Sequence, residues 1–193
     1  MKTKIGERFI TKEGYEVVIV DYKKYSDVWV EFQDEHKARV HTNIGACKKG
    51  EIKNPYHPSV YGVACLGLMS DGSKPKIKEK NGKHTREYMM WHDMVKRCYS
   101  ERLHEKYPTY KGCKVCERWL VYANFLEDLP KIENYELWLN GGYEIDKDKK
   151  QVGVENKIYS LETVCFITQS ENVKEMRARA YQKKKIKKLE NFG

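Results

Sequence analysis

The amino-acid sequence predicts an α+β protein built from two units. The first sixty residues hold short apolar runs separated by turn-forming residues, a pattern typical of small antiparallel sheets. A helical spacing of apolar residues begins near residue 86. Towards the C-terminus, a strand, a polar loop, a second strand and a helix follow one another. We therefore expect residues 1–60 and residues 61–193 to form separate domains.

Four strands are expected in the first domain. Within Val28–Phe32 the side chains alternate between apolar and polar, as a strand with one buried face requires. Turn formers separate these runs at intervals of roughly ten residues, which predicts a small antiparallel β-barrel of the SH3-like type. The four expected strands are Arg8–Ile10, Tyr15–Asp21, Val28–Phe32 and Arg39–His41.

The second domain is expected to begin with helices. Tyr88, Trp91, Met94, Val95 and Cys98 follow a helical period, which predicts an amphipathic helix. Aromatic residues that recur every three positions favour a second helix, and a third is expected before a run of Asn and Gly that ends it. The three expected helices cover residues 86–102, Val115–Leu126 and Ile132–Leu139.

Charge and composition restrict the class of protein. Of the 193 residues 40% are hydrophobic, which is enough for a packed core. Thirty-seven Lys and Arg against 28 Asp and Glu give a net charge of +9, which favours a polyanionic partner such as nucleic acid. No apolar run has the length of a membrane span, and the N-terminus has no signal-peptide pattern. We therefore expect a cytosolic protein with reduced cysteines and no membrane partner.

Two hard oxygen donors are expected to meet in the C-terminal part of the chain. Asp146 ends the expected strand Tyr143–Asp146, and Asn172 lies in the first turn of a helix that follows the strand Val164–Thr168. In a ββα arrangement these positions converge and suit one Mg²⁺ or Mn²⁺ ion. Such an ion needs only one or two protein ligands, because phosphate and water supply the others.

This region resembles the HNH, or ββα-metal, endonucleases of bacteriophages. The residues that carry the resemblance are Ile145-Asp146-Lys147, Glu155-Asn156-Lys157 and Val164–Asn172. The stretch Thr168–Asn172 matches the hallmark of the family closely. The resemblance implies a DNA-binding protein of a phage or prophage, acting in the host bacterial cytosol, which nicks or cleaves DNA with a divalent metal.

The same resemblance assigns roles to four residues. Asp146 and Asn172 take the metal-ligand positions, and Lys147 takes the position of the catalytic base. Asn156, also expected at the catalytic site, is the central Asn that shapes the loop. The family has a histidine where this chain has Lys147. A histidine accepts a proton near neutral pH, but a lysine with an ordinary pKa does not. Two alternatives therefore stay open: a catalytically degenerate HNH-like DNA binder, and a phage inhibitor that binds a host defence or transcription protein.

A structural zinc site is a weaker interpretation. Cys113 and Cys116 have zinc-knuckle spacing, and Cys98, His92, His104 or Cys165 would have to complete a tetrahedral site. A second CxxC or an HxxxH pair is absent, so structural Zn²⁺ at Cys113 and Cys116 is not expected.

The C-terminal segment carries the clearest signal for double-stranded DNA. Between residues 174 and 190, eight basic residues face two acidic ones, for a net charge of +6. This segment follows directly after the expected phosphodiester-binding helix, which favours contacts with the DNA backbone. The eight expected DNA-binding residues are Lys174, Arg177, Arg179, Lys183, Lys184, Lys185, Lys187 and Lys188.

Truncation after Tyr181 removes five of these eight cations and tests their contribution. Each neutralised phosphate contributes about −0.9 to the slope of log K against log salt, so five engaged cations contribute about −4.5. We expect the truncated chain to bind duplex DNA more weakly and with a flatter salt slope, measured by fluorescence anisotropy. An unchanged affinity and slope would show that the segment does not contact DNA.

Overall fold

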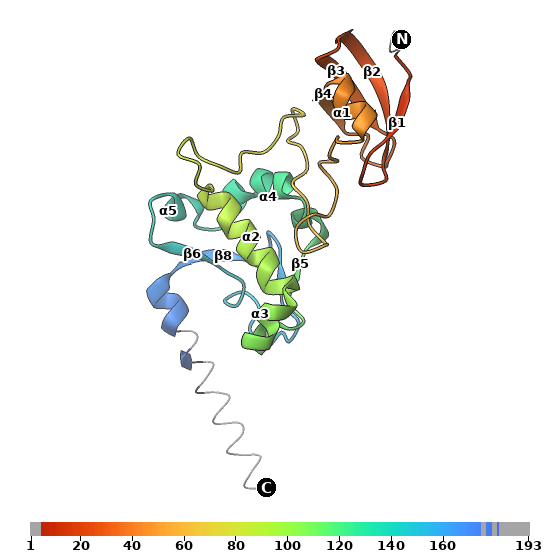
Figure 1. The fold of residues 1–193 in the computed structure, drawn as a ribbon. Helices are drawn as coiled ribbons and strands as arrows, with labels where there is room; N and C mark the ends of the chain where they lie inside the picture. Colours follow the sequence, from red (N-terminus) through yellow and green to blue (C-terminus); the bar gives the residue numbers. More distant parts are fainter. Residues whose placement is uncertain (1–4, 175–176, 179–180, 182–193) are drawn as a thin grey trace. The chain divides into compact units, whose positions relative to one another are not determined.

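A computed structural model describes residues 5–174, 177–178 and 181 of the chain (Figure 1). It is an α+β structure with a four-stranded antiparallel sheet, and it divides into two compact units. The first unit comprises the described part of Met1–Thr85 together with Leu120–Asn124, and the second the remainder. The division at residue 60 remains a prediction. Within the described chain, no helix combines the length and apolar character needed to span a membrane.

The sheet of the first unit follows the order of the chain. Its strands are β1 (Arg8–Ile10), β2 (Glu16–Lys24), β3 (Asp27–Phe32) and β4 (Arg39–Thr42), each antiparallel to its neighbours. Their inward side chains form a core that includes the fully buried Val17, Ile19, Val28, Val30 and Phe32. The alternation that predicted β3 is therefore confirmed.

No closed barrel is found in the described residues, because no pairing joins β1 to β4. A short helix, α1 (Ile44–Lys49), follows β4 at once and takes the place of a further strand. The side chain of Asn43 caps this helix by accepting a hydrogen bond from the Ala46 amide. Gly50 ends it with φ 65°, and its carbonyl accepts a hydrogen bond from Lys12 beside β1. The SH3-like likeness stays a prediction.

The second unit begins with α2 (Arg86–Tyr99) and α3 (Glu101–Lys106), where the sequence predicts one helix. The buried face of α2 consists of Trp91, Met94, Val95 and Cys98, as its spacing predicts. Ser100 separates the helices because its hydroxyl accepts a hydrogen bond from the Leu103 amide and starts α3.

The helix expected over Val115–Leu126 is wrong in its bounds. The structure has β5 (Lys114–Val115), a 3₁₀ turn η2 (Glu117–Leu120) and α4 (Tyr122–Asp128). Two causes explain the difference. Lys114 and Val115 pair with a parallel strand far along the chain, and aromatic residues at steps of three match the 3₁₀ period of 3.0 as well as the α-helical one.

The rest of the second unit carries two small sheets. The 3₁₀ turns η1 (Pro108–Tyr110) and η3 (Leu129–Lys131) precede the short helix α5 (Tyr135–Leu139), which is shorter than the predicted Ile132–Leu139. Strand β6 (Tyr143–Asp146) pairs antiparallel with β8 (Cys165–Thr168), close to the predicted bounds, and β5 pairs parallel with β7 (Ile158–Tyr159).

Asp128 joins the segments around η2 and α4. The residue is 4% exposed, and its carboxylate accepts hydrogen bonds from Arg118 at 2.7 Å, Lys131 at 2.8 Å and the Trp119 indole at 3.0 Å. Burial acts to raise the pKa of this carboxyl, but the hydrogen bonds outweigh burial and lower the pKa to about 2. The ionised form therefore stabilises the fold.

We expect Asp128→Asn to lower the free energy of unfolding by about 1–2 kcal/mol at pH 7, a value reduced because Arg118 and Lys131 are half-exposed. A lowered folded-state pKa contributes stability above about pH 4, and this contribution is lost as the pH falls towards 2. The difference in the free energy of unfolding between wild type and variant, measured by urea unfolding, should therefore shrink as the pH falls from about 4 towards 2. Glu117→Gln, an exposed carboxylate nearby, is the control and should change little. A pH-independent difference would contradict the account.

Candidate functional site

The candidate site is a pocket of about 320 Å³ in the second unit. Residues of α2, β6, β7 and the helix that follows β8 line it. Asp146 and Asn172, the two expected metal ligands, both belong to this lining although 26 positions separate them in the chain. The pocket also includes Lys147, at the position expected for the catalytic base.

A capping box sets the start of the helix that carries Asn172. The Thr168 amide and hydroxyl both donate to the Glu171 carboxylate at 2.9 Å, and the Glu171 amide donates to the Thr168 hydroxyl at 3.1 Å. Thr168 is also the last residue of β8, so strand and helix join without a loop. This junction places Asn172 one turn into the helix.

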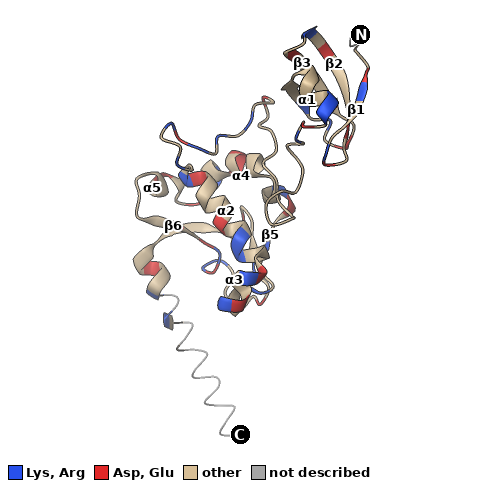
Figure 2. Cartoon of the chain, viewed as in Figure 1, with Lys and Arg blue, Asp and Glu red and all other residues tan. Residues whose placement is uncertain are grey.

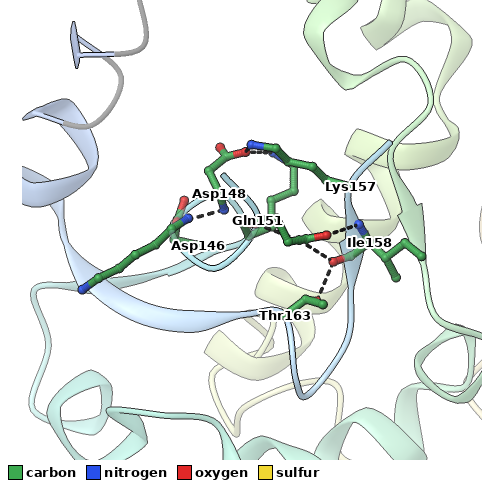
Figure 3. A network of polar contacts seen from close by, with 8 residues as sticks. Asp146, Asp148, Gln151, Lys157, Ile158 and Thr163 are labelled. Carbon is green, nitrogen blue, oxygen red and sulfur yellow. Dashed lines mark hydrogen bonds and ion pairs between the residues drawn. The ribbon is translucent and has the colours of Figure 1, made fainter. Parts of the chain in front are cut away.

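The carboxylate of Asp146 is fixed by the backbone that follows it (Figure 3). Its Oδ1 accepts hydrogen bonds from the amides of Asp148 at 3.0 Å and Lys149 at 2.8 Å. The residue is only 4% exposed, and no hydrogen bond among the described residues uses its Oδ2. Asp146 therefore lines the pocket with a carboxylate whose orientation is fixed through one oxygen.

Lys147 is held by charge and by aromatic rings. Its ammonium lies 3.1 Å from Asp148 Oδ1, and the Lys157 ammonium contacts the same oxygen. The rings of Tyr110 and Tyr159 lie 5.5 and 5.8 Å from the Lys147 nitrogen. An ammonium has three donors and no acceptor, so Lys147 in this arrangement donates to an anion rather than accepting a proton.

Gln151 is a site residue that the sequence did not indicate. Its side-chain amide donates to the carbonyls of Lys147 at 2.8 Å and Ile158 at 2.9 Å, and its oxygen accepts from the Ile158 amide at 3.0 Å (Figure 3). The Thr163 hydroxyl also donates to the Ile158 carbonyl, at 2.6 Å. These bonds tie the loop after β6 to β7 and thereby support Asp146. A glutamine in a polar loop gives no sequence signal for such a role.

Asn156 lies outside the pocket lining. The parallel pairing of β5 with β7 brings it beside Gly112, where a Cβ atom would overlap the Asn156 side-chain oxygen. Gly112 also has φ 82°, which favours glycine. This placement fits the role of shaping the loop, and its catalytic role stays a prediction.

Arg97 and Tyr159 are two further pocket residues that the sequence left unassigned. Burial acts to lower the pKa of the Arg97 guanidinium, but interactions with Tyr159, and further with Tyr110 and Asp93, outweigh burial and raise the pKa. Burial also raises the pKa of Tyr159, and Arg97 opposes that rise. Local sequence patterns could not indicate this pair, because Arg97 and Tyr159 lie 62 positions apart in the chain.

The cysteines show no arrangement typical of zinc. Burial raises the pKa of the Cys113 and Cys116 thiols, and it raises that of Cys98 to about 12. No group of three or more His, Cys, Asp or Glu among the described residues is placed to hold a metal. The His104 ring is engaged with the Arg97 carbonyl at 2.9 Å.

Of the expected DNA-binding residues, Lys174 and Arg177 are described, and both are exposed. Arg179 and the five lysines from Lys183 to Lys188 lie outside the described residues. Elsewhere, Lys and Arg are spread over the elements of both units (Figure 2). The described cations therefore do not themselves define one DNA-binding face.

Comparison of the chain with protein-family models, curated proteins and solved structures finds no match. The resemblance to HNH endonucleases therefore rests on the residues quoted above and stays a prediction.

Alanine at Gly112 tests the packing of Asn156 on β5. Gly153→Ala is a matched control, because Gly153 has φ 78° but open space where the Cβ would stand. The left-handed conformation costs alanine about 1 kcal/mol at either position. We expect Gly112→Ala to cost at least about 1 kcal/mol more than Gly153→Ala in urea unfolding, because Asn156 must move. Equal costs would show that the contact contributes nothing.

Proposed function

We propose that the second unit binds double-stranded DNA and nicks or cleaves it with a divalent cation. The observation that supports this most is the presence of Asp146 and Asn172 in one pocket with Arg97 and Lys147. A carboxylate and an amide oxygen beside two cationic side chains are the groups expected where a metal ion and a phosphodiester meet.

The donor set fits Mg²⁺ or Mn²⁺ better than zinc. Asp146 offers one oriented carboxylate oxygen and Asn172 an amide oxygen, and both are hard ligands. A zinc site needs three or four ligands from His, Cys, Asp or Glu, and the described residues contain no such group of three or more. When bound, Mg²⁺ would stabilise the negative charge that develops on the phosphate and on the leaving oxygen.

The protein side chains would supply binding and orientation. The backbone amides of Asp148 and Lys149 fix the Asp146 carboxylate, which lowers the entropy cost of binding a cation. Lys147, held beside Asp148, would donate to a phosphate oxygen. The attacking water would then lose its proton to solvent, because an ammonium has no acceptor.

The burial of Lys147 specifically favours a second candidate function. A base position filled by an ion-paired lysine that is 7% exposed is also consistent with a degenerate site that binds DNA without cleaving it. The two candidates differ only in whether the phosphodiester bond breaks.

Nicking of supercoiled plasmid in Mg²⁺ and in Mn²⁺ separates these candidates. We expect Asp146→Ala to lose at least 100-fold in nicking rate, because the oriented oxygen is removed. Glu136→Ala, which removes an exposed carboxylate from α5, should keep the wild-type rate. Plasmid that the wild type binds but leaves intact would support the degenerate binder, whereas a wild type that neither binds nor nicks would refute both.

Lys147→His tests whether the missing base limits the reaction. We expect the nicking rate to rise by about 10- to 100-fold near neutral pH, because imidazole can accept the proton of water. Lys157 keeps its contact with Asp148, so the loop retains one ion pair. Lys114→His on the exposed side of β5 is the control for a general effect of histidine. An unchanged rate in a wild type that cleaves well would mean that another group is the base.

A further inference from the structure

Arg97 is a cationic pocket residue for which the proposed function names no specific ligand contact. It lies on α2, in the lining of the pocket that contains Asp146 and Asn172. The residue is half-buried, and Tyr159 and the residues of β6 line the same pocket. A cation in such a place loses hydration and needs compensation from an anion or from oriented dipoles.

The described residues compensate the charge of Arg97 without an ion pair. Interactions with Tyr159, Tyr110 and Asp93 outweigh burial and raise the pKa of the guanidinium. No carboxylate of the described residues lies within 4.0 Å of it as an ion-pair partner. Arg118, by contrast, is half-exposed and yet pairs with both Glu127 and Asp128. A guanidinium has five N–H donors, so most of those on Arg97 are left for a ligand.

We propose that Arg97 binds a non-bridging phosphate oxygen of a nucleic-acid backbone in this pocket. The inference rests on the proposed function and adds a substrate-binding residue to it. A planar guanidinium matches two oxygens of one phosphate group, which a lysine at the same place would not. Tyr159 lines the same pocket and interacts with Arg97, so its hydroxyl would position the guanidinium.

The carboxylates that line the pocket oppose the binding of an anionic phosphodiester. Asp93, Glu144 and Asp146 also line the pocket, whereas Asp148 is already neutralised by Lys147 and Lys157. Three carboxylates repel an anion, so a phosphodiester binds well only when a divalent cation offsets them. Arg97 and the cation should therefore act together, and phosphodiester binding should require the metal.

A thymidine dinucleotide, which carries a single phosphodiester, isolates this contact from the basic C-terminal segment. Binding to the full chain is measured by NMR titration with and without Ca²⁺. We expect wild type to bind at least tenfold more tightly with Ca²⁺, and Arg97→Gln to weaken that binding at least tenfold. Arg102→Gln on the exposed side of α3 removes the same charge and should leave binding unchanged.

Two conservative variants keep the test decisive if Arg97→Gln does not fold. Arg97→Lys keeps the charge but loses the two-pronged contact, and Tyr159→Phe keeps the ring but loses the positioning hydroxyl. Each should weaken binding about three- to tenfold with an unchanged melting temperature. Wild-type affinity in these folded variants, or no dinucleotide binding by wild type in Ca²⁺, would overturn the assignment of Arg97.

Two further arms separate this inference from its alternatives. The first arm is competition with inorganic phosphate. If inorganic phosphate binds the pocket more tightly than the dinucleotide does, the pocket is a site for free phosphate, and the proposed nucleic-acid contact is overturned. Plasmid nicking separates the inference from the proposed function. Arg97-dependent dinucleotide binding without nicking would refute cleavage alone, whereas nicking with Arg97-independent binding would refute the inference alone.

Discussion

The antiparallel pairing of β6 with β8 is the constraint on which the site depends. Its register sets Asp146 opposite Cys165 and Tyr143 opposite Thr168. Strand β8 therefore ends beside the first residue of β6, and the chain continues from there directly into the helix. The capping box at Thr168 then places Asn172 one turn further, in the lining of the same pocket. Side chains of a strand alternate between its two faces, so a shift of the β6 register by one residue would turn Asp146 to the other face of the sheet.

Hydrogen bonds of the loop that follows β6 also hold Asp146 in place. Asp146 accepts two amides of its own loop, and Gln151 ties the loop to β7. The contact between Asn156 and Gly112 continues the same connection to β5. The carboxylate is therefore fixed through Oδ1, and no hydrogen bond among the described residues uses Oδ2. This is the preorganisation that a weakly ligated cation requires.

Local patterns predicted the local parts of the molecule. The bounds of β6, the buried face of α2 and the meeting of Asp146 and Asn172 in one pocket follow from alternation, helical period and spacing. Long-range contacts were not predictable in the same way. The break at β5 depends on pairing with β7, and the roles of Arg97 and Gln151 depend on partners that the folded chain supplies. The helix α1 is too short for its period to be read, although Asn43 and Gly50 mark its ends.

Cation binding by Asp146 and Asn172 is tested most directly by a crystal structure of the full chain soaked with Mn²⁺, using anomalous scattering to locate the ion. One peak is expected in the pocket, about 2.1 Å from an Asp146 oxygen and the Asn172 side-chain oxygen. Water should complete the octahedral coordination, with Arg97 facing an open position. An ion that contacts neither residue, or a pocket without an anomalous peak at saturating Mn²⁺, would contradict the proposed metal site.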